Sequence, residues 1–301
     1  MAKAKASVAP ERPLWRKIVD FPLVAMLIAI ALFIAATALG IFIGKQFGTM
    51  PQPERTVVRA VINIALMLAT YKLVIVKLGE HPRDDLPARG ALKNLGIGLA
   101  SGVVIFSIVV GVAALLGVYR IVGTGDTSMF VLELVGTAIL PGFMEELLFR
   151  GILFRWIEEF GGSWIALVVT SGLFGLAHIL NPNATWFSSF AIAMEAGVLL
   201  GGAYMLTRSL WMPMGLHAAW NFTQGEIFDV PVSGLDEHGL VQAKLSGPVL
   251  LSGGQFGLEA SVIALVGATL FGVWLVWFAI RSGKIVRPWW VRRRLEAPVV
   301  A

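Results

Sequence analysis

The sequence of 301 residues contains no cysteine, which excludes disulfides, thiolate metal sites and thiol nucleophiles. Charged residues are also scarce, at 14%, while 57% of the chain is hydrophobic. A soluble globular domain is about 25% charged and about 45–50% apolar. This composition argues against a soluble domain or a disordered chain, and it favours a polytopic membrane protein.

Long apolar stretches give the expected architecture. A helix that spans a bilayer needs about 20 mostly apolar residues. Eight stretches fit or approach this length, at 23–43, 57–78, 95–119, 128–144, 164–180, 186–206, 210–223 and 257–280. We therefore predict an all-α fold, a polytopic transmembrane bundle of about eight helices with both termini cytoplasmic.

The distribution of charge predicts the orientation in the lipid bilayer. With the N-terminus inside, the outer segments hold only four basic residues, Lys45, Arg55, Arg120 and Lys244, and most others fall inside. This is the bias of the positive-inside rule. The basic residues lie in tails and loops with little interleaved aromatic character, so we expect no nucleic-acid partner.

A single membrane domain with two tails is the expected layout. Residues 1–20 and 282–301 are predicted as basic cytoplasmic tails, and 21–281 as one transmembrane domain. Its catalytic core is expected at about 128–224, and the acidic segment 225–256 is expected as an external loop. The retained first helix and the lack of an obvious organelle signal favour the plasma membrane of a prokaryote.

Ionisable side chains within apolar spans are costly, so each is a functional-site hypothesis. Glu145, Glu146 and Arg150 form the first group. Glu146 and Arg150 are four residues apart and can form an ion pair in a helix. Glu145 then points elsewhere, and a less well paired carboxylate can act as a general base towards water. The alternative is an ordinary ion pair at an interfacial helix start.

Two further pairs place histidines in apolar stretches. Phe174 and His178 are four residues apart, as are His217 and Asn221, so each pair shares a helix face. Asn221 can orient His217, hold a water or donate to an oxyanion. Taken singly, each pair is also compatible with packed histidines and interhelical hydrogen bonds.

Together the three groups predict one polar chamber within a helix bundle. They supply a base, an electrophilic stabiliser and a group that orients water. No cysteine exists, and no serine or threonine forms a recognisable pair with a base. Water is therefore the expected nucleophile, and hydrolysis the expected class of reaction.

The ordered motifs EExxxR, FxxxH and HxxxN resemble those of the CPBP family, the CAAX-protease and bacteriocin-processing (Abi) intramembrane proteases. Here they read Glu145-Glu146-x-x-x-Arg150, Phe174-x-x-x-His178 and His217-x-x-x-Asn221. The resemblance covers about residues 128–224. It implies an endopeptidase that cleaves a peptide or protein substrate at the membrane, and some members of the family act on prenylated substrates.

The resemblance also implies roles for individual residues. Glu145 corresponds to the glutamate that activates water, and Arg150 to the arginine that holds Glu145 and Glu146. His217 and Asn221 correspond to the residues that stabilise the tetrahedral oxyanion. His178 matches the second-motif histidine and completes the predicted catalytic set.

The sequence leaves metal dependence open. Glu145, His178 and His217 can form a three-ligand zinc site with an open position for water. The same residues can work without metal, as a base with hydrogen-bond donors.

Two other functions compete with the protease. Buried carboxylates and histidines can form a proton or ion relay in a transporter, and a non-catalytic scaffold would need no reaction. Glu195 lies outside the motifs, and we expect it to face the chamber or to pair with Arg59 or Lys72, with no catalytic role. The helix ends predicted within 128–180 set Glu145 and His178 too far apart. Either the fourth helix continues to about Phe160, or the fifth begins outside the hydrocarbon.

Overall fold

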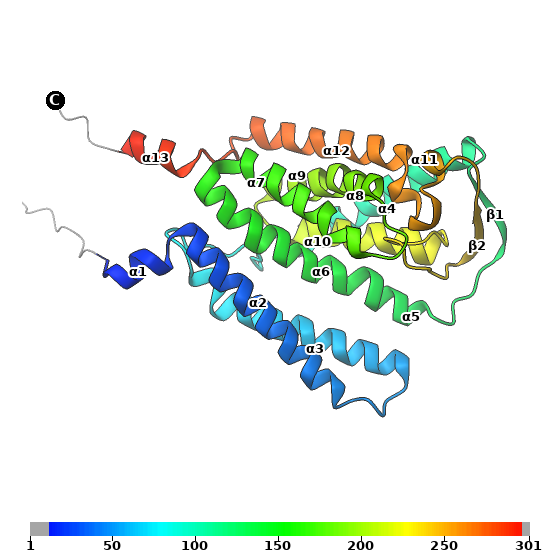
Figure 1. Cartoon of the computed structure of the whole chain (residues 1–301), viewed down its shortest axis with the longest axis horizontal. Helices are drawn as coiled ribbons and strands as arrows, with labels where there is room; N and C mark the ends of the chain where they lie inside the picture. Colours follow the sequence, from blue (N-terminus) through cyan, green and yellow to red (C-terminus); the bar gives the residue numbers. More distant parts are fainter. Residues whose placement is uncertain (1–11, 297–301) are drawn as a thin grey trace, which may run out of the picture.

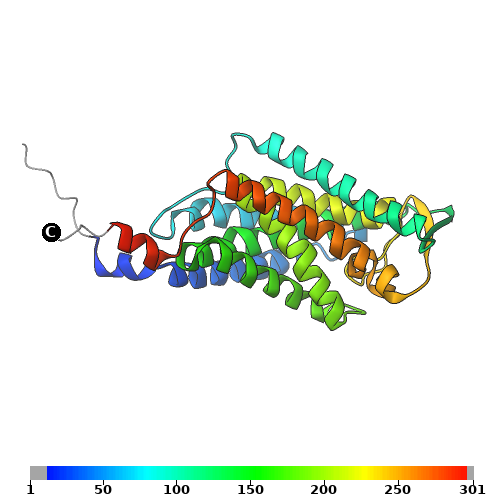
Figure 2. The ribbon, with the colours of Figure 1, turned by 90° about the horizontal axis from the view of Figure 1, so that it is seen from above.

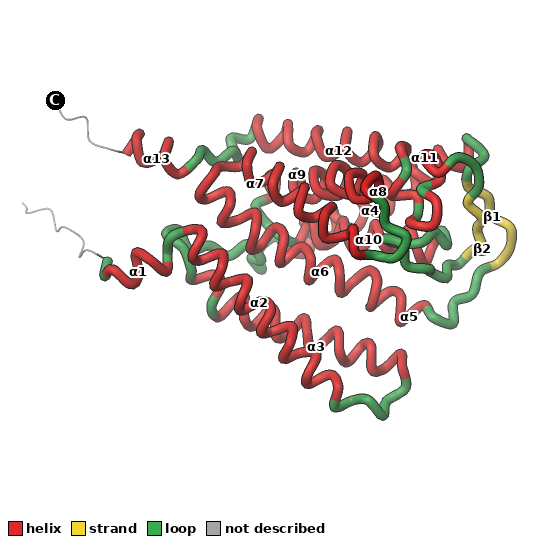
Figure 3. Tube along the Cα trace, in the orientation of Figure 1, coloured by secondary structure: helices red, strands yellow, loops and turns green. Residues whose placement is uncertain are grey.

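The computed structural model describes residues 12–296, and most of this part of the chain is helical (Figure 3). The outer parts of the predicted tails, 1–11 and 297–301, lie outside the described residues. The α-helices are α1 (Leu14–Val19), α2 (Pro22–Lys45), α3 (Gln52–Leu73), α4 (Ala91–Leu115), α5 (Phe130–Glu133), α6 (Leu140–Glu146), α7 (Arg155–Ala177), α8 (Trp186–Ile192), α9 (Val198–Thr207), α10 (Trp211–Phe222), α11 (Val249–Ser252), α12 (Val262–Arg281) and α13 (Trp289–Glu296). Strands β1 (Tyr119–Thr124) and β2 (Val241–Leu245) pair antiparallel.

Segments of other helical types join or extend the α-helices. The π-helical segments are Leu134–Ile139, Leu147–Phe154, Ala193–Gly197 and Thr223–Ile227. The short 3₁₀ segments are Ile75–Lys77, His178–Leu180, Gly254–Phe256 and Leu258–Ala260. π-Helical turns are rare and occur frequently at functional sites. The four π segments therefore indicate that the functional site lies among the helices that carry the motifs.

Within residues 12–296, six helical stretches are long and apolar enough to cross a membrane: Pro22–Lys45, Gln52–Lys77, Ala91–Leu115, Phe130–Leu180, Trp186–Thr207 and Val262–Arg281. The fourth has 51 residues, which as one straight helix would be roughly 76 Å long. Gly162 divides it, because its φ of 83° is not helical and the chain turns back there (Figure 1). Divided at Gly162, the fourth stretch forms two helices, and α10 with its π extension adds a shorter one. The bundle therefore agrees with the predicted count of about eight helices.

The predicted end of the fourth helix at residue 144 is wrong. The helix continues through α6 and Leu147–Phe154 into α7, and its first arm ends beside Gly162. The charges at Glu146 and Arg150 do not end the helix, because both side chains are fully buried and bonded to each other. Glu145 therefore lies near the middle of this arm. Of the two arrangements that would bring it closer to His178, the structure has the longer fourth helix.

Close packing of α4 on α10 positions the last motif. A Cβ atom at Gly98 would lie 2.2 Å from the backbone oxygen of Met212, and one at Gly102 would lie 2.5 Å from that of Leu216. Small residues let helix backbones approach in this way inside a membrane. The two glycines thus hold the helix that carries His217 against α4.

The two ends of the molecule differ in structure and charge. The terminal helices α1 and α13 lie at one end, and the β1–β2 ribbon lies at the other (Figures 1 and 2). At the first end Trp289 packs edge-on against Phe21, with ring centroids 6.3 Å apart, and Trp290 packs against Phe160. The segment between α10 and α12, which carries β2, covers the other end of the bundle.

Candidate active site

A buried ion pair forms the base of the site. Nη1 of Arg150 donates to Oε1 of Glu146 at 2.8 Å, and both side chains have no exposed surface. Nη2 of Arg150 donates to the backbone oxygens of Ala196 and Gly197, at 3.2 and 3.3 Å. Arg150 therefore ties the first motif to the π segment between α8 and α9.

His217 joins the last motif to the first. Its Nδ1 lies 3.0 Å from Oε1 of Glu146. Because a carboxylate only accepts, this contact requires the proton on Nδ1. Its Nε2 lies 4.0 Å from Oε2 of Glu145, whose side chain is 34% exposed. The imidazole thus stands between two carboxylates, one buried and one accessible.

The second motif packs on the same group. Nδ1 of His178 lies 2.7 Å from the backbone oxygen of Phe174 and donates to it, which leaves Nε2 free. The Phe174 ring lies 4.7 Å from the guanidinium carbon of Arg150 and 6.0 Å from the His217 ring. Phe174 is therefore an apolar wall that shields the Arg150 ion pair from water.

Asn221 is held by a backbone contact. Its Nδ2 donates to the backbone oxygen of Thr137 at 2.8 Å. Thr137 belongs to the π segment before α6. One N–H of the Asn221 amide remains beyond this bond, so it can serve an oxyanion.

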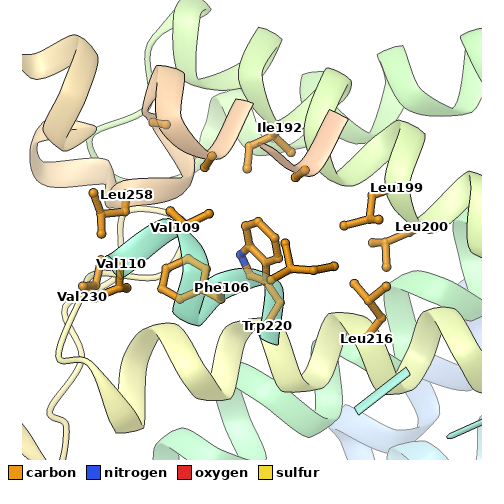
Figure 4. Packing of buried hydrophobic residues seen from close by; sticks show 14 of the residues in the cluster. Phe106, Val109, Val110, Ile192, Leu199, Leu200, Leu216, Trp220, Val230 and Leu258 are labelled. Carbon is orange, nitrogen blue, oxygen red and sulfur yellow. The ribbon is translucent and has the colours of Figure 1, made fainter. Parts of the chain in front are cut away.

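Residues of the second and third motifs meet at a small cavity, which Glu145 does not line. His178, His217 and Asn221 line it, together with Glu195 and Glu259. Its volume is about 30 Å³, which is enough for a water molecule and far below the roughly 300–1,000 Å³ of a typical ligand pocket. Leucine, isoleucine and tryptophan side chains complete the walls, and Figure 4 shows them around Trp220: Ile192, Leu199, Leu200 and Leu216.

A loop closes the cavity at the end that carries the ribbon. Ser233 and Glu259 line it there, and the backbone N–H of Ser233 donates to Oε1 of Glu259. Nδ2 of Asn181 donates to the backbone oxygen of Ser233 at 3.1 Å. Burial raises the pKa of Glu259 to about 7. We call Ser233 and Glu259 the roof of the cavity.

The structure brings the six predicted catalytic side chains into one region and adds three residues to it. Sequence reasoning assigned no role to Glu195, and it overlooked Ser233 and Glu259. Glu195 and Glu259 each carry a signal, because they are lone acids within apolar stretches. Ser233 carries none, since its position depends on the fold of the loop.

The predicted zinc ligands do not converge. Among the described residues, one group of three acidic or histidine side chains has its ligand atoms within 4.8 Å of one another: Glu80, His81 and Glu159. Glu145, His178 and His217 do not form such a group, although Nε2 of each histidine stays open, because the bond from Nδ1 to a protein oxygen is usual for a histidine ligand. The three ligand atoms as placed do not meet at one ion, so we derive no step through a metal.

The fold and this group of side chains define a helical membrane protein with a buried glutamate–histidine–arginine centre. The family model described as Rce1-like, Type II CAAX prenyl endopeptidase Rce1-like, matches residues 127–223. This segment contains all three motifs, and the match confirms the resemblance to the CPBP family of intramembrane proteases. It supports a membrane endopeptidase. Comparisons with curated proteins and with solved structures give no match.

Proposed function

We propose that the protein is an intramembrane endopeptidase that hydrolyses a peptide bond by glutamate-activated water. One observation carries the proposal: an accessible carboxylate, Glu145, faces an imidazole, His217, that is fixed from behind by Glu146. A base that faces a positioned partner, where the partner lines a cavity large enough for water, is the arrangement that such a hydrolysis requires.

These positions support the following reaction. Glu145 takes a proton from water, whose oxygen bonds to the carbonyl carbon of the substrate. The negative charge that develops on the carbonyl oxygen is stabilised by the free N–H of Asn221 and by Nε2–H of a doubly protonated His217, because its Nδ1–H is already bonded to Glu146. The tetrahedral intermediate then collapses, the C–N bond breaks, and the proton held by Glu145 passes to the leaving nitrogen. Arg150 and Glu146 keep His217 in place throughout.

The membrane location and orientation are part of the proposal. Six apolar helices make this an integral membrane protein. The positive-inside bias supports cytoplasmic termini and the plasma membrane of a prokaryote. The roof and the ribbon then lie at the outer end. A peptide or protein is the expected substrate, and whether it carries a prenyl group is the question that the assay must answer.

The test uses two probes on purified protein in lipid: a quenched farnesylated CAAX peptide and a library of unprenylated peptides. The wild type, Glu145→Gln and Glu54→Gln are compared with and without a chelator. Glu54 is exposed in the first turn of α3, so its variant controls for loss of one surface acid. The proposal expects cleavage by the wild type and Glu54→Gln, none by Glu145→Gln, and no effect of the chelator.

Two results would change the assignment. Cleavage that the chelator abolishes would replace the metal-free mechanism with a metal-dependent one. No cleavage of any probe, together with proton flux in reconstituted vesicles, would replace the protease with a proton or ion relay.

A further inference from the structure

Glu195 is a buried acid for which the described part of the chain provides no hydrogen-bond partner. It lies in the π segment Ala193–Gly197 and is 1% exposed. Neither of its carboxyl oxygens has a hydrogen-bond partner among the described residues. Because an unsatisfied buried polar group destabilises a fold, its presence requires an explanation.

The side chain faces the reaction centre. Glu195 lines the same cavity as His178, His217 and Asn221. The backbone oxygens of Ala196 and Gly197, the next two residues, accept hydrogen bonds from Arg150. The ion pair that fixes His217 therefore also fixes the backbone that carries Glu195.

A structural ion pair does not account for this acid. Nζ of Lys72 lies 2.6 Å from a carboxylate oxygen of Asp84, and Nε of Arg59 donates to the backbone oxygen of Gly44. The predicted pairing of Glu195 with either residue is thus wrong, and the prediction that it faces the chamber is right. Glu259, the other acid of the cavity, is held by the N–H of Ser233.

We propose that Glu195 is a further catalytic residue, which accepts a hydrogen bond from the N–H of the scissile peptide bond. The inference rests on the proposed function. A peptide group in the cavity presents a carbonyl oxygen and an N–H on opposite sides. His217 and Asn221 supply donors for the oxygen, and the free carboxyl oxygens of Glu195 supply an acceptor for the N–H. The contact orients the bond for attack and forms no covalent bond of its own.

Substrates that differ in one atom test this contact. A peptide that the wild type cleaves is compared with its ester analogue, in which oxygen replaces the scissile N–H. Glu195→Leu should cleave the peptide roughly 10- to 100-fold more slowly, the change expected when a buried N–H is left without its acceptor. The same variant should cleave the ester at the wild-type rate, because the ester has no N–H to donate.

Two variants make the comparison specific. Glu195→Gln keeps a carbonyl oxygen as acceptor, so it should retain more activity on the peptide than Glu195→Leu. Glu54→Gln should treat both substrates as the wild type does. An equal loss on peptide and ester would show a general disturbance of the site and overturn the proposal, as would full activity of Glu195→Leu on the peptide.

Thermal unfolding gives a readout that does not depend on activity. If Glu195 is kept for catalysis, its replacement by leucine or glutamine should leave the melting temperature unchanged or raise it. A melting temperature lowered by several degrees in both variants would reveal a structural role and overturn the inference. If the wild type cleaves no probe, the proposed function and this inference fail together. If the wild type cleaves the peptide and Glu195→Leu cleaves it equally well, only this inference is overturned and the proposed function stands.

Discussion

Nδ1 of His217 lies 3.0 Å from the oxygen of Glu146 to which Arg150 also donates. One buried carboxylate oxygen therefore connects the first motif to the last, although the residues are 71 positions apart. The two neighbouring glutamates consequently differ in their surroundings, which suits the different tasks proposed for them. Glu146 is fully buried and holds other side chains, whereas the side chain of Glu145 is partly exposed.

This division predicts different outcomes for two single substitutions. Glu146→Gln should destabilise the protein by about 3–5 kcal/mol, because it leaves the Arg150 charge buried without a counter-charge. Glu145→Gln should change stability by less than about 0.5 kcal/mol, since its side chain is partly exposed and it has no such role. Both variants should lose cleavage. Denaturant unfolding in detergent measures the difference, and equal stabilities would contradict the assigned tasks.

Two glycines of α4 give a matched pair for the helix packing. Gly98→Ala should lower stability by about 1–3 kcal/mol, because the new methyl group meets the backbone of α10. Gly96→Ala meets no atom within 4 Å and should be neutral or stabilising by up to about 1 kcal/mol. Thermal unfolding of the two variants measures this difference in stability. Similar melting temperatures would show that α4 and α10 are packed less tightly than the structure indicates.

Stability should depend on pH through the loop at the ribbon end. Burial raises the pKa of Glu237 to about 7, from an ordinary value of 4.5. A hydrogen bond with Glu133 raises the pKa of His238. Both groups favour the protonated form in the folded state. Their stabilising effect is therefore full at low pH and is lost as the pH rises through about 7.

Melting temperatures measured from pH 5 to pH 8 test this expectation. The wild type should melt at a lower temperature at pH 8 than at pH 5. Glu237→Gln, which cannot ionise, should show a smaller decrease over the same range. A variant with the same pH profile as the wild type would show that Glu237 does not contribute.

The orientation is testable because the natural chain contains no cysteine. Gln255 is exposed at the ribbon end, and Arg89 is exposed in the segment before α4, at the opposite end. In intact cells, a membrane-impermeant maleimide should label Gln255→Cys and leave Arg89→Cys unlabelled until the cells are lysed. The reverse pattern would place the roof of the cavity in the cytoplasm.

Much of the architecture could be predicted from the sequence, because the bilayer requires long apolar helices and the chain supplies them. The motif residues were recognisable because charges are rare in such helices. The end of the fourth helix could not be predicted in the same way. The charges of Glu146 and Arg150 compensate each other across one turn, so the helix continues past them. The role of Gly162 was also hidden, because its contact is with Val286, far along the chain.

The details of the site depend on contacts that a sequence pattern does not contain. The spacing of His217 and Asn221 predicted a shared face, but not that Asn221 would bond to Thr137. An acid in an apolar stretch marked Glu195 as unusual without saying where it would point. Ser233 reaches the cavity only because the loop between α10 and α12 folds back over the bundle.

The size of the cavity has a kinetic consequence. A space of about 30 Å³ holds a water molecule but no peptide. A peptide can therefore bind only after some of the residues that line the cavity have moved, and the roof, with its contact between Ser233 and Glu259, is one part that can do so. Motions of such loops take microseconds to milliseconds or longer. If the proposed cleavage takes place, the frequency of this rearrangement sets an upper limit on its turnover.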